Sequence, residues 1–208
     1  MFGVRMLLNA AVGIIMLGLV PAVRAENKSI GVARNAVGVL IVVRADGVQE
    51  RLQGKGTLPL YEGDVAKTDA AGRALLEMMG AQVGLNEQTT VKFLARWEKH
   101  KPPTGILRIT RGELWLKMAA GSAPLEIETP VANVLAREGE FDMKVQDDGQ
   151  STLAVTQGGA QVSTPFGACF VLAPSASVNT RGKVCKKLAS SDSTPLLAWL
   201  QPLRKELQ

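Results

Sequence analysis

The sequence is poor in the residues from which catalytic and stacking sites are usually built. Its 208 residues include one His, one Tyr and two Cys, and aromatic residues make up 4% of the chain. A single His cannot supply a multi-histidine metal site and leaves little for a histidine relay. So few aromatic rings also argue against platforms that stack on single-stranded nucleic acid or sugars. The composition therefore points away from enzymes.

The first 25 residues have the organisation of an export signal. Arg5 ends a short n-region, Met6–Val20 contains no ionisable side chain, and Pro21 ends the apolar run. Val23 and Ala25 supply small residues at the −3 and −1 positions of a cleavage site. We expect cleavage after Ala25 and a periplasmic mature protein. The alternative is an uncleaved membrane anchor, although the run is short for about 30 Å of hydrocarbon; only this segment would then touch the membrane.

Positive charge is in modest excess. The formal net charge is +5, and removal of the export signal with Arg5 and Arg24 lowers it by two, to +3. An excess this small and spread along the chain does not predict a nucleic-acid partner.

The two cysteines agree with export. Cys169 and Cys185 are the only cysteines in the chain, and an even count in an oxidising compartment favours one disulfide. Closing a loop of this length stabilises a protein by about 3 kcal/mol in the chain-entropy model. The alternative is a pair of free thiols.

Residues 26–188 consist of short alternating segments separated by turn residues. Phe141, Met143 and Val145, for example, alternate with Asp142 and Lys144. Such segments, bounded by Gly, Pro and Asp, recur about every eight to twelve positions. The pattern predicts an all-β fold, an antiparallel sandwich or barrel of many short strands.

Three stretches depart from the strand pattern. Glu98–Thr104, with the single His and two prolines, is expected to be an exposed loop, and Gly54–Thr57 is expected to be a loop because it lacks full phosphate-loop spacing. Residues 189–208 are predicted to hold a linker and then a short C-terminal helix, Pro195–Glu206, with leucines at near-helical spacing. The helix either packs on the end of the domain or docks on a partner.

Two segments resemble each other within the chain. Leu125–Pro130 and Ala160–Pro165 are alternating strands that both end in Thr-Pro. Because proline ends ladder pairing, this echo indicates either one corner used twice or two strand endings that converged.

Four sequence elements lie in the order found in a known domain family. They are the run Leu60–Thr68 with Gly72 after it, the step Leu107–Leu114, the element Glu128–Ala132 and the strand Val155–Val162. Together they resemble the FecR domain over residues 37–163. The motif residues to which the resemblance assigns structural roles are Gly63, Asp64, Thr68, Gly72, Gly112, Thr129, Pro130 and Gly158.

The resemblance implies a function in protein interaction or signalling. The best-known FecR proteins place a cytoplasmic anti-sigma-factor segment before a membrane helix and relay the signal of an outer-membrane transporter. Here five residues precede the apolar run, so we expect a stand-alone exported FecR-like domain without that output segment. The Arg-Gly-Thr-x-Phe run usual in the family is replaced by Arg137–Phe141, with the glycine displaced and the threonine missing.

The candidate catalytic residues also have structural interpretations. Asp64 and Asp69 could act as paired carboxylates, but acids at such turn steps usually hydrogen-bond their own backbone. Asp147–Gly149 lacks the spaced ligands of a calcium loop, and His100 has no Cys or second His near it. We therefore expect no enzymatic activity, no cofactor and no metal. A hydrolase that uses Asp64 is the enzymatic alternative.

Arg96, Trp97 and Lys99 form the candidate binding surface, a basic rim with one aromatic anchor. The alternative is a half-buried tryptophan that seals a strand end. We hypothesise a non-enzymatic periplasmic adaptor module that binds an envelope protein. The alternative function is binding of an envelope polysaccharide or peptidoglycan.

Overall fold

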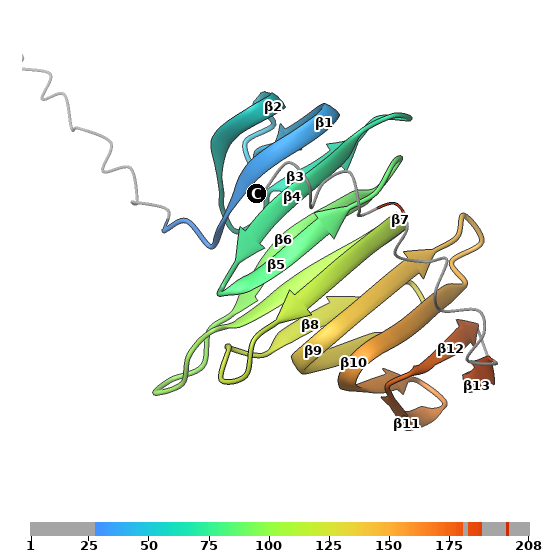
Figure 1. Ribbon diagram of the computed structural model, residues 1–208. Coiled ribbons are helices and arrows are strands. Elements are labelled where there is room, and N and C mark those ends of the chain that lie inside the picture. Colours follow the sequence, from blue (N-terminus) through green and yellow to red (C-terminus); the bar gives the residue numbers. More distant parts are fainter. Residues whose placement is uncertain (1–27, 181–182, 189–198, 200–208) are drawn as a thin grey trace, which may run out of the picture.

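The computed structural model describes residues 28–180, 183–188 and 199, and almost all of them lie in β-strands or the turns between strands (Figure 1). The all-β prediction is therefore confirmed. The predicted export signal lies outside the described residues, as does the predicted C-terminal helix apart from Trp199. In the described part of the chain, no helix has the length and hydrophobicity needed to cross a bilayer. The strands are β1 (Gly31–Val43), β2 (Gln49–Leu60), β3 (Val65–Thr68), β4 (Arg73–Met78), β5 (Ala81–Leu85), β6 (Thr90–Arg96), β7 (Thr104–Met118), β8 (Leu125–Glu128), β9 (Asn133–Val145), β10 (Ser151–Thr164), β11 (Gly167–Leu172), β12 (Ser175–Thr180) and β13 (Lys183–Leu188).

Six of these strands close into a ring. β7 pairs with β5, and the ring continues through β4, β1, β3 and β6 back to β7. Beyond β7 the sheet extends through β8, β9 and β10, so that in Figure 1 it runs from β1 and β2 at the top to β11–β13 at the bottom. Among the described strands only β7 and β8 pair in parallel. The fold thus combines a barrel-like ring with an added antiparallel sheet.

The four longest strands that cross this sheet change neighbours part-way along their length. β1 pairs with β4 as far as Val37 and with β3 from Leu40 onward. β7 pairs with β6 up to Arg111 and with β5 from Leu114, and β9 and β10 make the same kind of change. A strand that bends between two sets of partners carries the sheet around a corner.

Glycines with positive φ occupy these bends. Gly112 separates the two halves of β7 with a φ of 97°, and a Cβ at this position would lie 2.4 Å from Thr89 Oγ1. Gly158 of β10, with a φ of 79°, is paired with Gly139 of β9, where φ is 120°. Because L side chains rarely adopt these φ values, glycine is required where the strands turn. The motif glycines Gly112 and Gly158 are therefore corner residues.

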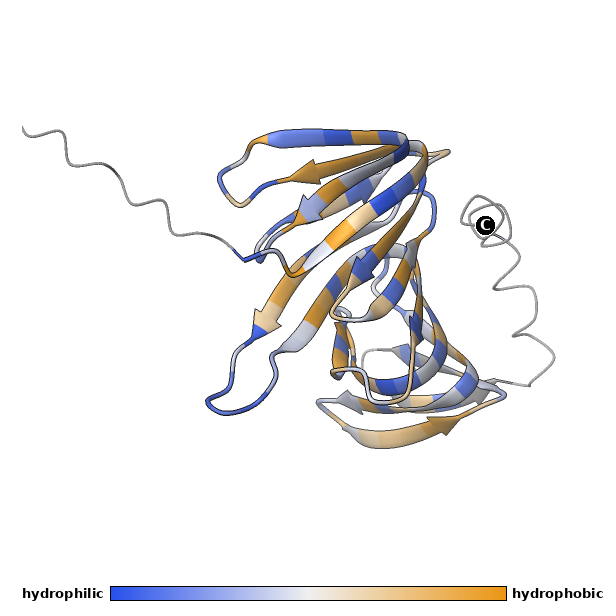
Figure 2. Cartoon of the chain, turned by 60° about the vertical axis from the view of Figure 1, so that its left-hand side comes forward, coloured by the Kyte–Doolittle hydropathy of each residue, from blue (hydrophilic) through white to orange (hydrophobic). Residues whose placement is uncertain are grey.

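The hydrophobic core is formed by alternate residues of the strands, and Figure 2 shows this alternation of hydropathy along each ribbon. The predicted inward set Phe141, Met143 and Val145 is buried, with at most 3% of any of these residues exposed. Burying a side chain of this size contributes about 1.5–3 kcal/mol relative to leaving it in water. Phe141 and Phe93 are the largest side chains that are fully buried in the described residues.

One local prediction is wrong and another is confirmed. Gly54–Thr57, expected to be a loop, lies inside β2, because Lys55 pairs with Asn35 and Gly54 with Ala36 of β1. The bulge in this pairing accommodates the positive φ of Gly54. The exposed connection expected at Glu98–Thr104 does separate β6 from β7, which begins at Thr104.

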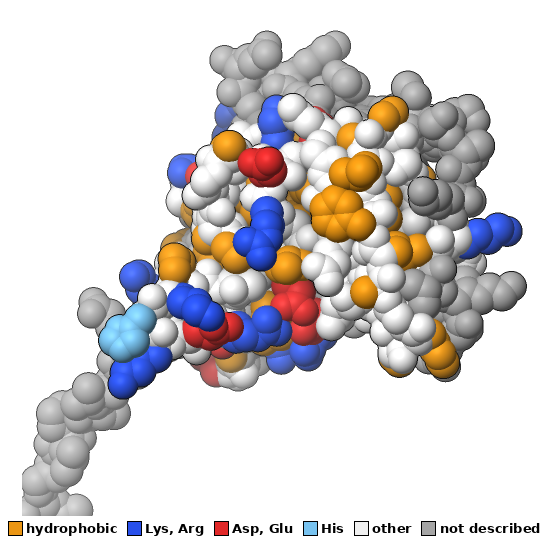
Figure 3. Space-filling view, turned by 90° about the horizontal axis from the view of Figure 1, so that it is seen from below, with side chains coloured by type: hydrophobic (Ala, Val, Ile, Leu, Met, Phe, Trp, Pro, Cys, Tyr) orange, Lys and Arg blue, Asp and Glu red, His pale blue; other side chains and the backbone are white. Residues whose placement is uncertain are grey.

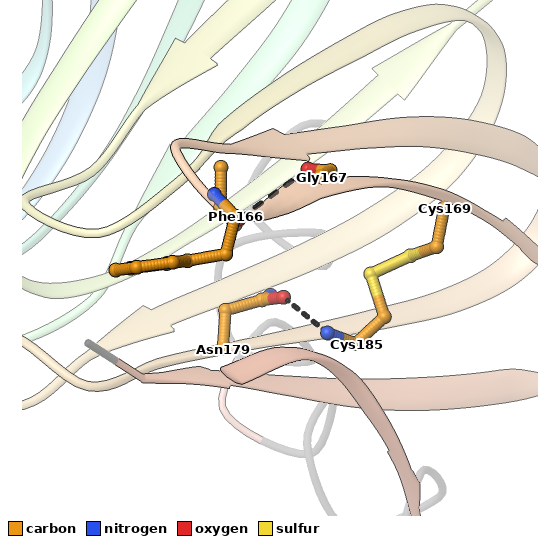
Figure 4. Close-up of a disulfide and its surroundings, with 6 residues drawn as sticks. Phe166, Gly167, Cys169, Asn179 and Cys185 are labelled. Atoms are coloured by element: carbon orange, nitrogen blue, oxygen red, sulfur yellow. Dashed lines mark hydrogen bonds between the residues drawn. A yellow bond between two sulfur atoms is a disulfide. The ribbon is translucent and has the colours of Figure 1, made fainter. Parts of the chain in front are cut away.

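The predicted disulfide is present and joins two strands at the end of the sheet (Figure 4). Cys169 of β11 and Cys185 of β13 have their Cα atoms 6.4 Å apart. The backbone N–H of Cys185 also donates to Asn179 Oδ1 at 3.2 Å. The bridge ties β11 to the β12–β13 hairpin, although β11 itself is hydrogen-bonded to β10.

Candidate functional site

The motif acid Asp64 is a structural residue of a turn. It is 2% exposed, and its Oδ2 accepts hydrogen bonds from the backbone N–H of Tyr61 at 2.9 Å and from Arg44 Nη1 at 2.5 Å. Arg44 in turn donates to Glu50 Oε1 at 2.7 Å and lies over the ring of Tyr61. Oδ2 of Asp64 is thus held by a turn amide and a guanidinium, as expected for an acid with a structural role in its turn.

The other motif residues of this region also build turns. Thr68 Oγ1 accepts a hydrogen bond from the backbone N–H of Thr89 at 2.9 Å and donates to the carbonyl of Asn86 at 2.5 Å. Asp69 Oδ1 accepts from the N–H of Ala71, and Gly72 packs so closely on this carboxylate that a Cβ would lie 2.5 Å from it. Asp64 and Asp69 therefore serve two separate turns. Gly63 precedes Asp64 with a φ of 91°.

The two Thr-Pro corners are built in the same way and lie side by side. Thr129 Oγ1 accepts from the N–H of Val131 and donates to the carbonyl of Ala132, and Thr164 Oγ1 makes equivalent bonds to Phe166 and Gly167. These corners end β8 and β10, and with Pro130 and Pro165 they line one pocket of about 380 Å³. The sequence echo therefore corresponds to one hydrogen-bonded corner used twice.

A pocket of about 600 Å³ has Trp97 on its wall. Its apolar lining consists of Ile30, Val32, Met78, Met79, Ala81, Trp97 and Pro103. Met79 and the following Gly80 both have positive φ, as the short β4–β5 hairpin turn requires, and this turn directs Met79 toward the pocket. A lining of flexible thioethers and one indole adapts to apolar side chains of varied shape.

The three residues of the predicted surface do not act as one cluster. Trp97 is 56% exposed, and its Nε1–H donates to Glu62 Oε2 at 3.2 Å. Arg96 forms an ion pair with Glu126 at 2.9 Å, while Lys99 is exposed in the β6–β7 connection. Of the three, Trp97 alone lines the pocket. Their role in binding stays a prediction.

One charged residue of the pocket lining, Glu77, is paired at the surface. Arg34 Nε donates to Glu77 Oε2 at 2.8 Å, and Glu77 belongs to the pocket lining. This hydrogen bond and the charge of Glu77 raise the pKa of Arg34 above its ordinary value. His100, with a φ of 64°, lies in the exposed connection after Trp97. No group of three potential metal ligands occurs in the part of the chain that the structure describes.

Comparison with known proteins agrees with the turns and corners described above. Residues 64–161 match the family model described as FecR protein. Residues 64–161 are therefore similar to the FecR domain. A search of curated proteins finds no match.

The fold has solved relatives. Two crystal structures, at 2.50 and 1.65 Å resolution, of a candidate anti-sigma factor from Parabacteroides distasonis ATCC 8503 each match with 19% identity and a TM-score of 0.54. The match covers 66% of this chain and 64% of the other, so the chain spans less than two thirds of that protein's length. At this identity the likeness shows a shared fold.

An exposed apolar face of β11, beyond the matched FecR segment, was missed by sequence reasoning. Phe166 is 65% exposed, Phe170 59% and Leu172 61%. Phe170 and Leu172 lie across Gly159 of β10, where a Cβ would come within 2.9 Å of both side chains. Figure 3 shows hydrophobic side chains exposed on the face of the molecule seen from below. We call Phe166, Phe170 and Leu172 the β11 face.

The alternation in this strand contained the signal for that face. Val171 is buried, so its neighbours Phe170 and Leu172 must point to the opposite side of the sheet. Only the position of β11 at the edge of the sheet makes that side an exposed one, and sequence spacing does not report that position.

Proposed function

We propose that this FecR-like domain is a non-enzymatic protein-interaction module of the periplasm that takes part in signalling by binding an envelope protein. The observation that carries the proposal is the β11 face. Three large apolar side chains are more than half exposed there. Phe170 and Leu172 are neighbours over Gly159, and exposed apolar groups of this kind are typical of protein interaction sites.

The β11 face adjoins a strand edge that is free among the described residues. β11 is hydrogen-bonded to β10 on one side and to no described strand on the other. An extended segment of a partner can pair with such an edge, and alternate apolar side chains of that segment would then cover Phe170 and Leu172. The proposed partner segment is therefore an extended strand with apolar residues at alternate positions.

The disulfide supports this function because it reduces the cost of binding. Cys169 lies between the exposed residues of β11 and is bonded to Cys185 of β13. A strand held in place before the partner arrives loses less conformational entropy on association. The fold shared with a candidate anti-sigma factor supports a regulatory role for the bound state.

A photo-crosslinking amino acid placed at Phe170 of the tagged full chain tests the proposal in cells. We expect a light-dependent adduct whose partner peptide, located by mass spectrometry, is an extended apolar segment. Leu172→Ser in the same chain should abolish the adduct. The matched control carries the crosslinker at Val48, which is 55% exposed in the β1–β2 turn at the other end of the sheet.

Equal adducts at Phe170 and Val48 would contradict the proposal, as would an adduct that persists with Leu172→Ser. An adduct obtained only with the crosslinker at Trp97 would transfer the binding role to the Trp97 pocket. Sedimentation of the mature protein with purified cell walls examines the alternative function, and retention that survives Leu172→Ser would favour peptidoglycan binding. An N-terminus at Glu26 in the exported protein is the expected result for the proposed periplasmic location.

A further inference from the structure

One row of residues is buried on the side of the sheet opposite the main core. Leu75, Gly84, Trp115, Asp142 and Ala154 are direct cross-strand neighbours on β4, β5, β7, β9 and β10. Their neighbours along each strand, such as Leu76, Leu116 and Met143, belong to the main core. Yet Leu75 is 4% exposed, Trp115 2% and Asp142 1%. The sheet is therefore covered on both faces along this row, which we call the Trp115 row.

The side chain of Trp199 packs on the Trp115 row. It packs with Val37 against Leu75 and Trp115 in a hydrophobic cluster separate from the main core. Trp199 belongs to the C-terminal segment, far in sequence from the strands on which it packs. The occupant of this apolar face is thus a tryptophan of the same chain.

A buried acid lies in the same row. Among the described residues, neither carboxylate oxygen of Asp142 has a hydrogen-bond partner at good distance and angle. The same is true of the indole Nε1 of Trp199. Burial raises the pKa of Asp142 well above its ordinary value, and the charge and hydrogen bonding of Glu113 raise it further. The indole N–H of Trp199 and the charge of Lys144 act in the opposite direction. Asp142 is therefore a protonated carboxyl group beneath an indole over a wider pH range than an exposed aspartate.

We propose that the Trp115 row is a docking site for the indole of Trp199, which stays docked while Asp142 holds a proton and leaves when that proton is lost. This inference concerns a different face from the β11 face and does not depend on the proposed function. In the docked state the neutral carboxyl of Asp142 is shielded from water by the indole. Loss of the proton to solvent leaves a carboxylate beside Glu113, and hydration of this charge requires the indole to move away.

Of the other charged groups around Asp142, Lys144 offsets such a charge only weakly, as the smallest of the influences on the Asp142 pKa. Glu113 on β7 is 8% exposed and accepts a hydrogen bond from Asn86 Nδ2 at 2.8 Å, so it adds negative charge. Lys144 is cross-strand to Glu113 rather than to Asp142. On β10 the neighbours on this face are Ala154 and Thr152, which carry no charge. Glu140, on the other side along β9, accepts a hydrogen bond from Trp115 Nε1 at 2.8 Å.

The direction of the pH effect follows from the proton count. The pKa of Asp142 is higher when the indole is docked than when it has left, because Asp142 regains contact with water in the open state. The docked state therefore keeps its proton up to a higher pH than the open state does. Docking is therefore favoured at low pH and weakens as the pH rises through the raised pKa of Asp142. Asp142→Asn keeps the shape of the neutral group and should hold Trp199 docked at every pH.

Fluorine NMR of the full chain labelled with 5-fluorotryptophan tests this switch, because the chain has three tryptophans and Trp199→Phe assigns the resonance of Trp199. Between about pH 4 and about pH 9 we expect the Trp199 resonance to move from a buried to a solvent-exposed position. The resonance of exposed Trp97 is the internal control and should not follow this transition. Asp142→Asn should remove the transition, and Glu113→Gln should move its midpoint to lower pH.

Trp199→Ala provides a second measurement that does not depend on a substitution inside the sheet. In that variant Trp115 should become accessible to a fluorescence quencher at all pH values, whereas in the wild type it should do so only at high pH. A Trp199 resonance that is exposed throughout, or that stays buried without a transition, would overturn the inference. A transition that persists in Asp142→Asn would do so too. A buried resonance that appears only at high protein concentration would assign the docked tryptophan to a second copy and overturn docking within one chain.

Discussion

Two aspartates of this protein are equally buried, and their surroundings differ in every other respect. Asp64 is 2% exposed and Asp142 1%. The first accepts hydrogen bonds from a turn amide and from Arg44, whereas both oxygens of the second lack a partner of full geometry among the described residues. Asp64 is held by Arg44 within its turn, while the pKa of Asp142 is raised by burial and by Glu113.

The difference shows that burial alone does not decide what a carboxyl group contributes to the fold. A buried carboxylate with two donors contributes to stability, but a buried carboxyl without them is a site where a change of protonation changes the structure. Asp64 belongs to the motif that resembles the FecR domain, and Asp142 lies beneath a residue of the C-terminal segment.

The largest expected effect is that of Asp64→Asn. Loss of the charge that binds Arg44 should lower the free energy of unfolding by about 3 kcal/mol, because the guanidinium is left partly buried with Glu50 alone. Asp142→Asn should change it by less than about 1 kcal/mol at low pH, since the native carboxyl is neutral there. Urea unfolding of both variants measures the contrast. Equal losses of unfolding free energy in the two variants would contradict the difference between the Asp64 and Asp142 sites.

The next effect is a pH dependence of opposite sign at the two sites. The pKa of Asp142 lies above its ordinary value of 3.8, so the native state retains a proton that the unfolded chain has lost. Stability should therefore fall as the pH rises from about 4 toward that raised pKa, by about 1.4 kcal/mol for each unit by which it is raised. Asp142→Asn should remove this loss.

Beside Asp64, the hydrogen bond from Arg44 lowers the pKa of Glu50 below its ordinary value of 4.5. The unfolded chain then binds the proton more tightly, so this contribution is present at neutral pH and is lost as the pH falls below about 4.5. It should be small, because the Glu50 side chain is 44% exposed. Glu50→Gln should flatten the acid side of the stability curve and leave the alkaline side unchanged.

A further comparison is between Trp115 on β7 and Trp97 in the β6–β7 connection. Trp115→Phe removes the buried donor to Glu140 and should cost about 1–2 kcal/mol. Trp97→Phe removes an exposed hydrogen bond to Glu62 at 3.2 Å and should cost less than about 0.5 kcal/mol. Thermal unfolding of the two variants compares them. A larger loss for Trp97→Phe would mean that its pocket supports the fold more than the Trp115 row does.

Much of the fold could be predicted where the cause is local. Asp64 follows Gly63 in a turn, and acids at such steps bind nearby backbone N–H groups, so its structural role follows from a few residues. The alternation of Phe141 with Asp142 predicted a strand, and the two cysteines predicted their bond. Gly54–Thr57 was misassigned because a bulged strand and a loop use the same glycine chemistry.

The candidate sites depended on contacts that have no local signature. Alternation places Asp142 on the polar side of β9, but that side is buried because Trp115 is its cross-strand neighbour and Trp199 packs on the row. Phe170 and Leu172 are of residue types that usually lie in a hydrophobic core. They are exposed because β11 lies at the edge of the sheet.

The sequence by itself indicated most of the turns, the strand periodicity and the FecR resemblance, and it favoured the disulfide, because each depends on the stereochemistry of neighbouring residues or on a count of cysteines. The tertiary structure alone decided which polar face is buried and which apolar face is exposed. Those outcomes depend on the register between strands distant in the chain, and a strand has the same alternation whether its second face meets water or Trp199.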